Sequence, residues 1–153
     1  MDDLYYMNLA IEEALKALSM EEVPVGAVIV LDGEVISRAH NQRESLPDAT
    51  AHAEILAIKE ACRVTSNWRL EGATIYVTKE PCIMCAGAII NARLKRLVYG
   101  CDDPKGGAAV SLYNLLSDRR LNHQVEVTRG IMEERCRQLL TDFFKSLRYD
   151  RGV

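Results

Sequence analysis

The strongest constraint on the fold of this chain is the alternation of short β-branched runs with amphipathic segments. The helix expected over residues 3–19 has an apolar stripe at helical spacing, formed by Leu4, Met7, Ile11, Ala14, Leu15 and Leu18. Strands are expected at 25–30 and 34–39, and the dipeptide Asp32-Gly33 between them is a hairpin turn signal. This start predicts an antiparallel strand pair that is packed against a helix.

The rest of the chain continues as alternating helices and strands: helix 52–64, strand 73–78, helix 81–91, strand 96–99, a short helix 111–116, strand 125–128 and helix 131–148. The last helix has its own apolar stripe, formed by Ile131, Met132, Leu139, Leu140, Phe143, Phe144 and Leu147. This order predicts an α/β protein with three α/β/α layers, whose mixed sheet combines one antiparallel hairpin with parallel strands.

Composition indicates one domain spanning residues 1–153. Hydrophobic residues make up 48% of the 153, which is enough for a buried core. The sequence has no apolar run of about 18 residues, so no membrane span is expected, and Asp2 and Asp3 do not resemble the start of a secretory signal. A cytoplasmic location is therefore the expectation.

Charge is unevenly distributed, although the net charge is only −3. Residues 1–60 carry 4 basic and 12 acidic side chains, whereas residues 61–153 carry 15 basic and 10 acidic ones. Such asymmetry permits a basic face toward nucleic acid, and an ordinary mixed-charge surface is the alternative.

The five cysteines favour metal binding over a disulfide framework, because their number is odd. Cys82 and Cys85 are three residues apart at the start of an expected helix, so both sulfur atoms can reach one ion. Together with His52, they form a ligand set typical of zinc. Three protein ligands leave a fourth position for water, which is the arrangement of a catalytic site, and one ion per chain is expected. The alternative for the cysteine pair is a redox motif.

Glu54 stands two residues after His52 and is expected to be a general acid/base beside the bound water rather than a ligand. The remaining cysteines, Cys62, Cys101 and Cys136, are expected to be buried thiols, and Met84 is expected in the core.

Several segments together resemble the bacterial tRNA-specific adenosine deaminases of the cytidine-deaminase-like superfamily. The matching segments are Glu22-Val23-Pro24-Val25-Gly26-Ala27, His40-Asn41, Thr50-Ala51-His52-Ala53-Glu54, Tyr76-Val77-Thr78, Glu80-Pro81-Cys82-Ile83-Met84-Cys85-Ala86-Gly87-Ala88, Asp103-Pro104-Lys105-Gly106-Gly107, Leu121-Asn122-His123 and Phe143-Phe144-Lys145. The resemblance implies a five-stranded sheet, a homodimer and conversion of adenosine to inosine at the wobble position of a tRNA. It also implies that Asn41 contacts the target nucleoside and that the loop from Asp103 to Lys105 borders the RNA.

Three positions depart from the family pattern as we expect it. Lys79 replaces an apolar residue, Ala49 replaces a proline, and Val110 stands where glycine is common. Val110 matters most, because a branched side chain disfavours positive φ and the loop near the RNA is expected to differ there.

Two other functions remain open at this point. A deaminase of a free base or nucleoside, of the guanine or cytosine type, has the same zinc motif. An RNA-binding module with a structural zinc has no use for Glu54. For the RNA reading, an anticodon stem-loop is the expected partner, with phosphate contacts from Lys105, Lys145, Arg148 and Arg151.

Overall fold

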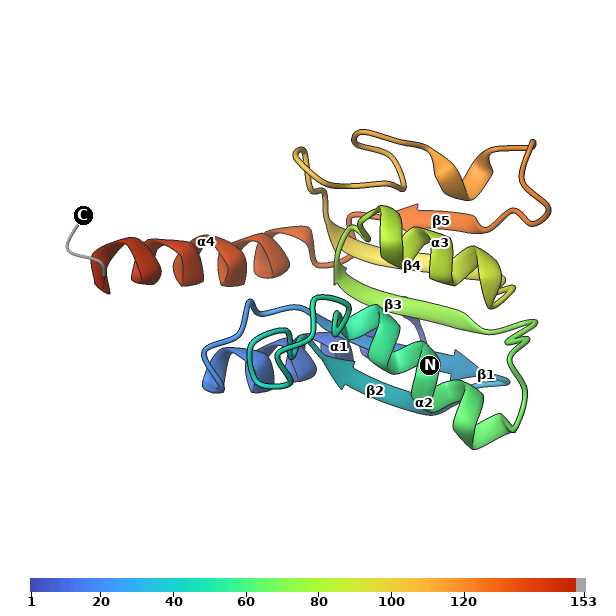
Figure 1. Cartoon of the computed structure of the whole chain (residues 1–153), viewed down its shortest axis with the longest axis horizontal. Coiled ribbons are helices and arrows are strands. Elements are labelled where there is room, and N and C mark those ends of the chain that lie inside the picture. The colour runs from blue at the N-terminus through green and yellow to red at the C-terminus, as the bar shows by residue number, and fades with distance from the viewer. Residues whose placement is uncertain (151–153) are drawn as a thin grey trace.

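Five strands form one mixed sheet with the order β2-β1-β3-β4-β5 in the computed structural model, which describes residues 1–150 and side chains as far as residue 148 (Figure 1). The strands are β1 (Gly26–Leu31), β2 (Glu34–His40), β3 (Thr74–Lys79), β4 (Arg96–Cys101) and β5 (Glu126–Arg129). β1 is antiparallel to both β2 and β3, whereas β3, β4 and β5 are parallel. It follows that β2, β3, β4 and β5 all run in one direction, so their carboxyl ends lie at the same edge of the sheet.

Helices cover both faces of this sheet, which confirms the three-layer α/β/α prediction. One face packs against α1 (Asp3–Ser19) and α4 (Glu133–Asp150), and the other against α2 (Ala53–Thr65) and α3 (Ile83–Asn91). Residues along each strand alternate between the two cores: Ile29 and Ile75 face α2 and α3, whereas Val28 and Tyr76 face α1 and α4. Figure 1 shows that α4 projects beyond the sheet. No helix within residues 1–150 is long and apolar enough to cross a membrane.

The buried face of α1 differs from the prediction. Leu4, Leu15 and Leu18 are exposed, and small residues outside the predicted stripe, Ala10 and Ala17, are buried in their place. The cause is a very close approach of the helix to β1 at Gly26, where an added Cβ would lie 2.0 Å from the Ala10 carbonyl oxygen. Small residues permit that approach and turn the larger leucines toward the flanks.

The predicted hairpin is confirmed. Asp32 and Gly33 have φ values of 51° and 79°, as the type I′ turn requires. The last helix begins at Glu133, two residues later than expected, because Gly130 and Met132 both have positive φ.

The predicted helix over 111–116 is wrong. This stretch forms turns followed by one short 3₁₀ turn, Leu115–Ser117. Its amide groups have other partners: Ser111 N–H donates to a glutamate side chain, and Leu112 N–H donates to the Gly107 carbonyl oxygen. The burial predictions hold for Cys101 and Cys136, but Cys62 and Met84 are only partly buried.

Candidate metal centre and active site

The candidate site lies at the edge of the sheet where the parallel strands end. Asn41 follows β2, Lys79 is the last residue of β3, and Asp103 comes two residues after β4. Helices α2 and α3 begin at the same edge, with His52 and Cys82 as their N-cap residues. The topology therefore brings together segments that are far apart in the sequence, as is usual for ligand sites in α/β sheets.

His52, Cys82 and Cys85 form one cluster whose potential ligand atoms all lie within 4.8 Å of one another. The Nδ1 atom of His52 lies 3.7 Å from the Cys82 sulfur and 3.4 Å from the Cys85 sulfur. In a tetrahedral zinc site, ligand distances of about 2.0–2.3 Å separate a nitrogen from a sulfur by about 3.6 Å. The spacing of the three donors thus fits a metal ion of that size.

Electrostatics also suit a cation at this position. Cys82 and Cys85 lie at the N-terminus of α3, where the helix dipole stabilises a thiolate. A hydrogen bond with the Cys85 thiol is the main cause that lowers the pKa of Cys82 to about 3, against the effect of burial. The hydrogen bond with Cys82 raises the pKa of His52. Metal binding would release the protons that this cluster otherwise shares.

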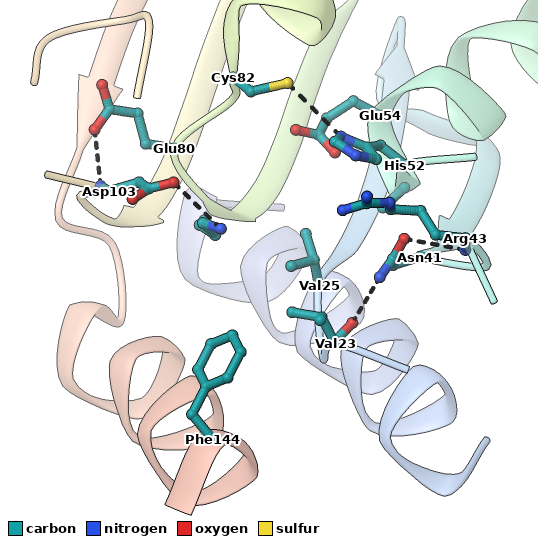
Figure 2. A pocket seen from close by; sticks show the side chains of 12 residues that line it. Val23, Val25, Asn41, Arg43, His52, Glu54, Glu80, Cys82, Asp103 and Phe144 are labelled. Atoms are coloured by element: carbon teal, nitrogen blue, oxygen red, sulfur yellow. Dashed lines mark hydrogen bonds and ion pairs between the residues drawn. The ribbon is translucent and has the colours of Figure 1, made fainter. Parts of the chain in front are cut away.

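Glu54 lies in the first turn of α2 with only 4% of its surface exposed. Figure 2 shows its carboxyl group beside His52, at the wall of a pocket. Burial is the main cause that raises the pKa of Glu54. A carboxyl group with a raised pKa in a cleft is suited to accept and donate protons near neutral pH.

The pocket in front of Glu54 has a volume of about 280 Å³, just below the usual range of about 300–1,000 Å³ for small-molecule sites. Twelve residues line it: Val23, Val25, Asn41, Arg43, His52, Ala53, Glu54, Lys79, Glu80, Cys82, Asp103 and Phe144. Of the three residues expected to bind substrate, Asn41 and Asp103 therefore line the pocket. Lys105 is exposed on the same loop as Asp103, outside the lining.

The side chain of Asn41 is engaged with the backbone on both sides. Its Nδ2 donates to the Val23 carbonyl oxygen at 3.3 Å, and its Oδ1 accepts from the Arg43 N–H at 3.4 Å. These bonds use one N–H and one lone pair of the amide, so a second N–H and a second lone pair are left for a partner in the pocket.

Glu80 fixes the loop that carries Asp103. Its carboxylate is 2% exposed and accepts hydrogen bonds from five groups. These are the N–H groups of Asp103 (2.9 Å), Ala109 (3.1 Å), Val110 (2.8 Å) and Ser111 (2.9 Å) and the Ser111 hydroxyl (2.5 Å). Gly107 makes the close approach possible, because a Cβ there would lie 2.2 Å from the Glu80 carboxyl carbon.

Val110, which stands where glycine is common in the family, belongs to this loop. Its φ is not positive, so the position does not need a glycine, and its N–H is one of the donors to Glu80. The branched side chain of Val110 is therefore accommodated without backbone strain. The Lys79 departure also has a structural role: its Nζ lies 3.2 Å from an Asp103 carboxylate oxygen at the pocket rim.

Arg43, Lys79 and Phe144 are among the pocket residues that the sequence does not identify as part of the site. Lys79 was noted only as a departure, and Arg43 belongs to a polar loop without a recognisable motif. Phe144 was placed in the apolar stripe of the last helix, yet it is 44% exposed and faces the pocket (Figure 2). The sequence did contain a signal for it: Phe143 and Phe144 are about 100° apart on a helix, so only one of them can lie at the centre of the buried face.

Two of the cations expected to contact phosphate lie on the last helix. Lys145 and Arg148 are exposed on α4, on the part that follows Phe143. Arg151 lies outside the described residues.

Comparisons with known proteins agree with one another. A family model described as MafB19-like deaminase matches residues 1–148. A tRNA-specific adenosine deaminase of Bacillus subtilis (strain 168) is 54% identical over 146 residues, which cover 95% of this chain and 91% of that protein. A protein of the same name from Aquifex aeolicus (strain VF5) is 49% identical over 144 residues, 94% of this chain and 95% of that protein.

Solved structures extend this picture. One from a study of A-to-I editing by tRNA:A34 deaminases at the wobble position of transfer RNA has a TM-score of 0.86 and 48% identity, covering 89% of this chain and 99% of that one. A guanine deaminase from Bacillus subtilis has a TM-score of 0.64 and 36% identity, covering 67% of this chain and 66% of that one.

Proposed function

We propose, because the chain belongs to the family of tRNA-specific adenosine deaminases, that it converts adenosine to inosine at the wobble position of tRNA by hydrolysis, with release of ammonia. The observation that carries this proposal is the buried Glu54 carboxyl group beside a three-donor metal cluster, in a pocket of about 280 Å³. A pocket of this size takes one nucleobase rather than a paired helix, so the target base must leave its stack.

The metal is proposed to be zinc, held by His52, Cys82 and Cys85 at one ion per chain. When bound, zinc supplies a water molecule that is acidic enough to lose a proton at neutral pH. We expect elemental analysis to give one zinc per chain. Cys85→Ala should lose most of that zinc, and retention of zinc at full affinity would contradict the assignment.

Glu54 is proposed to carry the protons, as the non-ligand glutamate does in zinc-dependent nucleobase deaminases generally. It takes a proton from the attacking water, passes one to the ring nitrogen of adenine, and assists the departure of ammonia. Glu54→Gln is expected to keep zinc but to lose a factor of at least about 10²–10⁴ in turnover. Near-native turnover in that variant would remove Glu54 from the mechanism.

Recognition of RNA is proposed to use Asn41, Asp103 and Lys105 around the pocket, with Lys145 and Arg148 as phosphate contacts on α4. Asn41 and Asp103 both lie in the lining and both offer hydrogen-bonding groups. A side-chain amide or carboxylate can pair with the ribose 2′-hydroxyl, which a DNA strand lacks. An anticodon loop is the favoured substrate, since its bases are already partly unstacked.

A free-base deaminase is the alternative, because the guanine deaminase of Bacillus subtilis has a related structure. The test compares an anticodon stem-loop having adenosine at the wobble position with free adenosine and free guanine. We expect the stem-loop to be deaminated fastest. Faster turnover of either free compound would overturn the RNA assignment.

We further propose a homodimer and a cytoplasmic location. The outer face of α3 supports the dimer: Ile83 is 55% exposed, and Met84, Gly87 and Ala88 are only partly buried. An apolar helix face of this kind gains stability when a second copy covers it. Light scattering at micromolar concentration should give twice the mass of the chain, 17.1 kDa, and a monomer would contradict the proposal.

A further inference from the structure

A second buried glutamate, Glu22, fixes the other loop that borders the pocket. Glu22 follows α1, and its side chain is 1% exposed. Its carboxylate oxygens accept hydrogen bonds from the N–H groups of Glu44, at 3.1 Å, and Ser45, at 2.6 Å. A buried carboxylate that accepts backbone N–H groups fixes their position, because moving them away would leave a buried charge without partners.

These bonds hold the backbone on the C-terminal side of Arg43, and other bonds hold Arg43 itself. The Arg43 N–H donates to Asn41 Oδ1 at 3.4 Å, and its carbonyl oxygen accepts from Asp48 N–H at 3.0 Å. Both main-chain groups of Arg43 are thus engaged, and the two residues that follow it are bonded to Glu22. The stem of the Arg43 side chain therefore starts from a fixed point.

The guanidinium group of Arg43 has no such partner. It lines the pocket, and Figure 2 shows it reaching toward the pocket interior beside His52, on the side opposite Asp103. Within the part of the chain that the structure describes, no hydrogen bond or ion pair engages this guanidinium, whereas the Asp103 carboxylate is paired with Lys79. The pocket mouth thus presents an unpaired, planar cation on a rigid support.

We propose that Arg43 binds a phosphate of the target strand beside the flipped adenosine and that Glu22 is a positioning residue for it; the proposal rests on the RNA deaminase function given above. A nucleotide turned into the pocket leaves its phosphates at the pocket mouth. A guanidinium group matches a phosphate with two parallel hydrogen bonds. Free bases and nucleosides have no phosphate, so this contact favours a strand over a free compound.

The test uses Arg43→Gln, Glu22→Gln and the double variant, with an anticodon stem-loop as substrate. Arg43→Gln is expected to raise KM about tenfold or more, as for loss of a charge-assisted hydrogen bond, with kcat within about twofold. The slope of log binding affinity against log salt concentration should become shallower by about 1, as expected for the loss of one phosphate contact. Glu22→Gln should raise KM by several-fold, because its new amide group cannot accept both N–H groups. In the Arg43→Gln background, Glu22→Gln should raise KM by less than about a further twofold.

Arg63→Gln is the matched control, because Arg63 is an exposed arginine near the end of α2, away from the pocket, and its loss should leave KM and the salt slope unchanged. Glu22→Asp, which keeps the charge but shortens its reach, replaces Glu22→Gln if that variant does not fold. An unchanged salt slope in Arg43→Gln would overturn the phosphate contact, and multiplicative effects of the two substitutions would overturn the positioning role. No turnover of the stem-loop by the unaltered protein would instead overturn the proposed function, and this inference with it.

Discussion

Replacing Glu80 by glutamine tests whether one buried carboxylate organises the loop that carries Asp103. The change keeps the shape of the side chain but removes the charge and replaces one oxygen by an NH₂ group. In the better of the two orientations, the remaining oxygen keeps the three N–H donors Ala109, Val110 and Ser111. The NH₂ group then faces the Asp103 N–H and the Ser111 hydroxyl, and only the hydroxyl can turn to accept.

The expected loss of folding stability follows from this count of hydrogen bonds. Three bonds change from charge-assisted to neutral, at about 1 kcal/mol each, and one N–H without a partner costs about 1–3 kcal/mol. The gross loss is therefore about 4–6 kcal/mol. Glutamine is cheaper to bury than a carboxylate, which offsets part of it and leaves about 2–3 kcal/mol.

Urea unfolding at neutral pH measures this difference, and stem-loop kinetics measure its effect on the pocket. For a domain of this size, about 2–3 kcal/mol corresponds to a Tm lower by about 4–12 °C. KM is expected to rise, because the loop with Asp103 loosens while the metal cluster at the N-termini of α2 and α3 stays in place.

The pH dependence supplies an independent check. Burial by itself would raise the pKa of Glu80, but the hydrogen bonds from the Ser111 side chain and from the backbone N–H groups outweigh it and lower the pKa below 4.5. A lowered pKa stabilises the folded state above the pKa of the unfolded chain, and that stabilisation is lost as the pH falls through the folded value. The stability gap between the two proteins should therefore be full at neutral pH and narrow below about 4.5. An equal free energy of unfolding at neutral pH, with an unchanged KM, would refute this account of Glu80.

Three further substitutions separate the contributions around the pocket. Gly107→Ala adds a methyl group 2.2 Å from the same buried carboxyl carbon, so we expect a displaced loop, a higher KM and a loss of about 1–3 kcal/mol in urea unfolding. Lys79→Leu leaves Asp103 unpaired at the pocket rim; KM for the stem-loop should rise a few-fold at low salt, and the difference should shrink at high salt. Phe144→Ala removes a half-exposed ring that faces the pocket and can stack on a base of the loop, so it should raise KM about tenfold with little change in stability. Its matched control, Phe143→Ala, removes an 8% exposed ring and should cost about 3–5 kcal/mol of stability instead.

Most strands and helices were predictable because their signals are local. The Asp32-Gly33 turn fixes the hairpin through backbone geometry alone. The buried face of α1 was not predictable, since it depends on the contact between Ala10 and Gly26, two residues in different elements. The helix expected over 111–116 failed for a similar reason: its N–H groups bond to Glu80 and Gly107 rather than to one another.

The candidate site also has residues that local sequence signals identify and residues that only the folded chain brings together. The spacing of Cys82 and Cys85 and their combination with His52 identify a metal cluster within the sequence, and the structure brings all three donors together. Arg43 and Phe144 carry no such spacing. They reach the pocket because β2 and β5 end at the same edge of the sheet, and that relation exists only in the folded chain.

Because α4 projects beyond the sheet, the pocket wall that this helix forms can move more easily than the other walls. Phe143 is the last buried side chain of this helix among the side chains described, which extend to residue 148, and the next three residues are exposed. The helix end that carries Phe144 can therefore fray without opening either core, whereas the loops at Glu22 and Glu80 cannot move without breaking buried bonds. Amide hydrogen exchange should reveal a gradient along α4, slow near Cys136 and fast from Phe144 onward. A pocket of this kind adapts to its substrate from one side only, and the entropy lost when that helix end is ordered reduces the affinity for RNA.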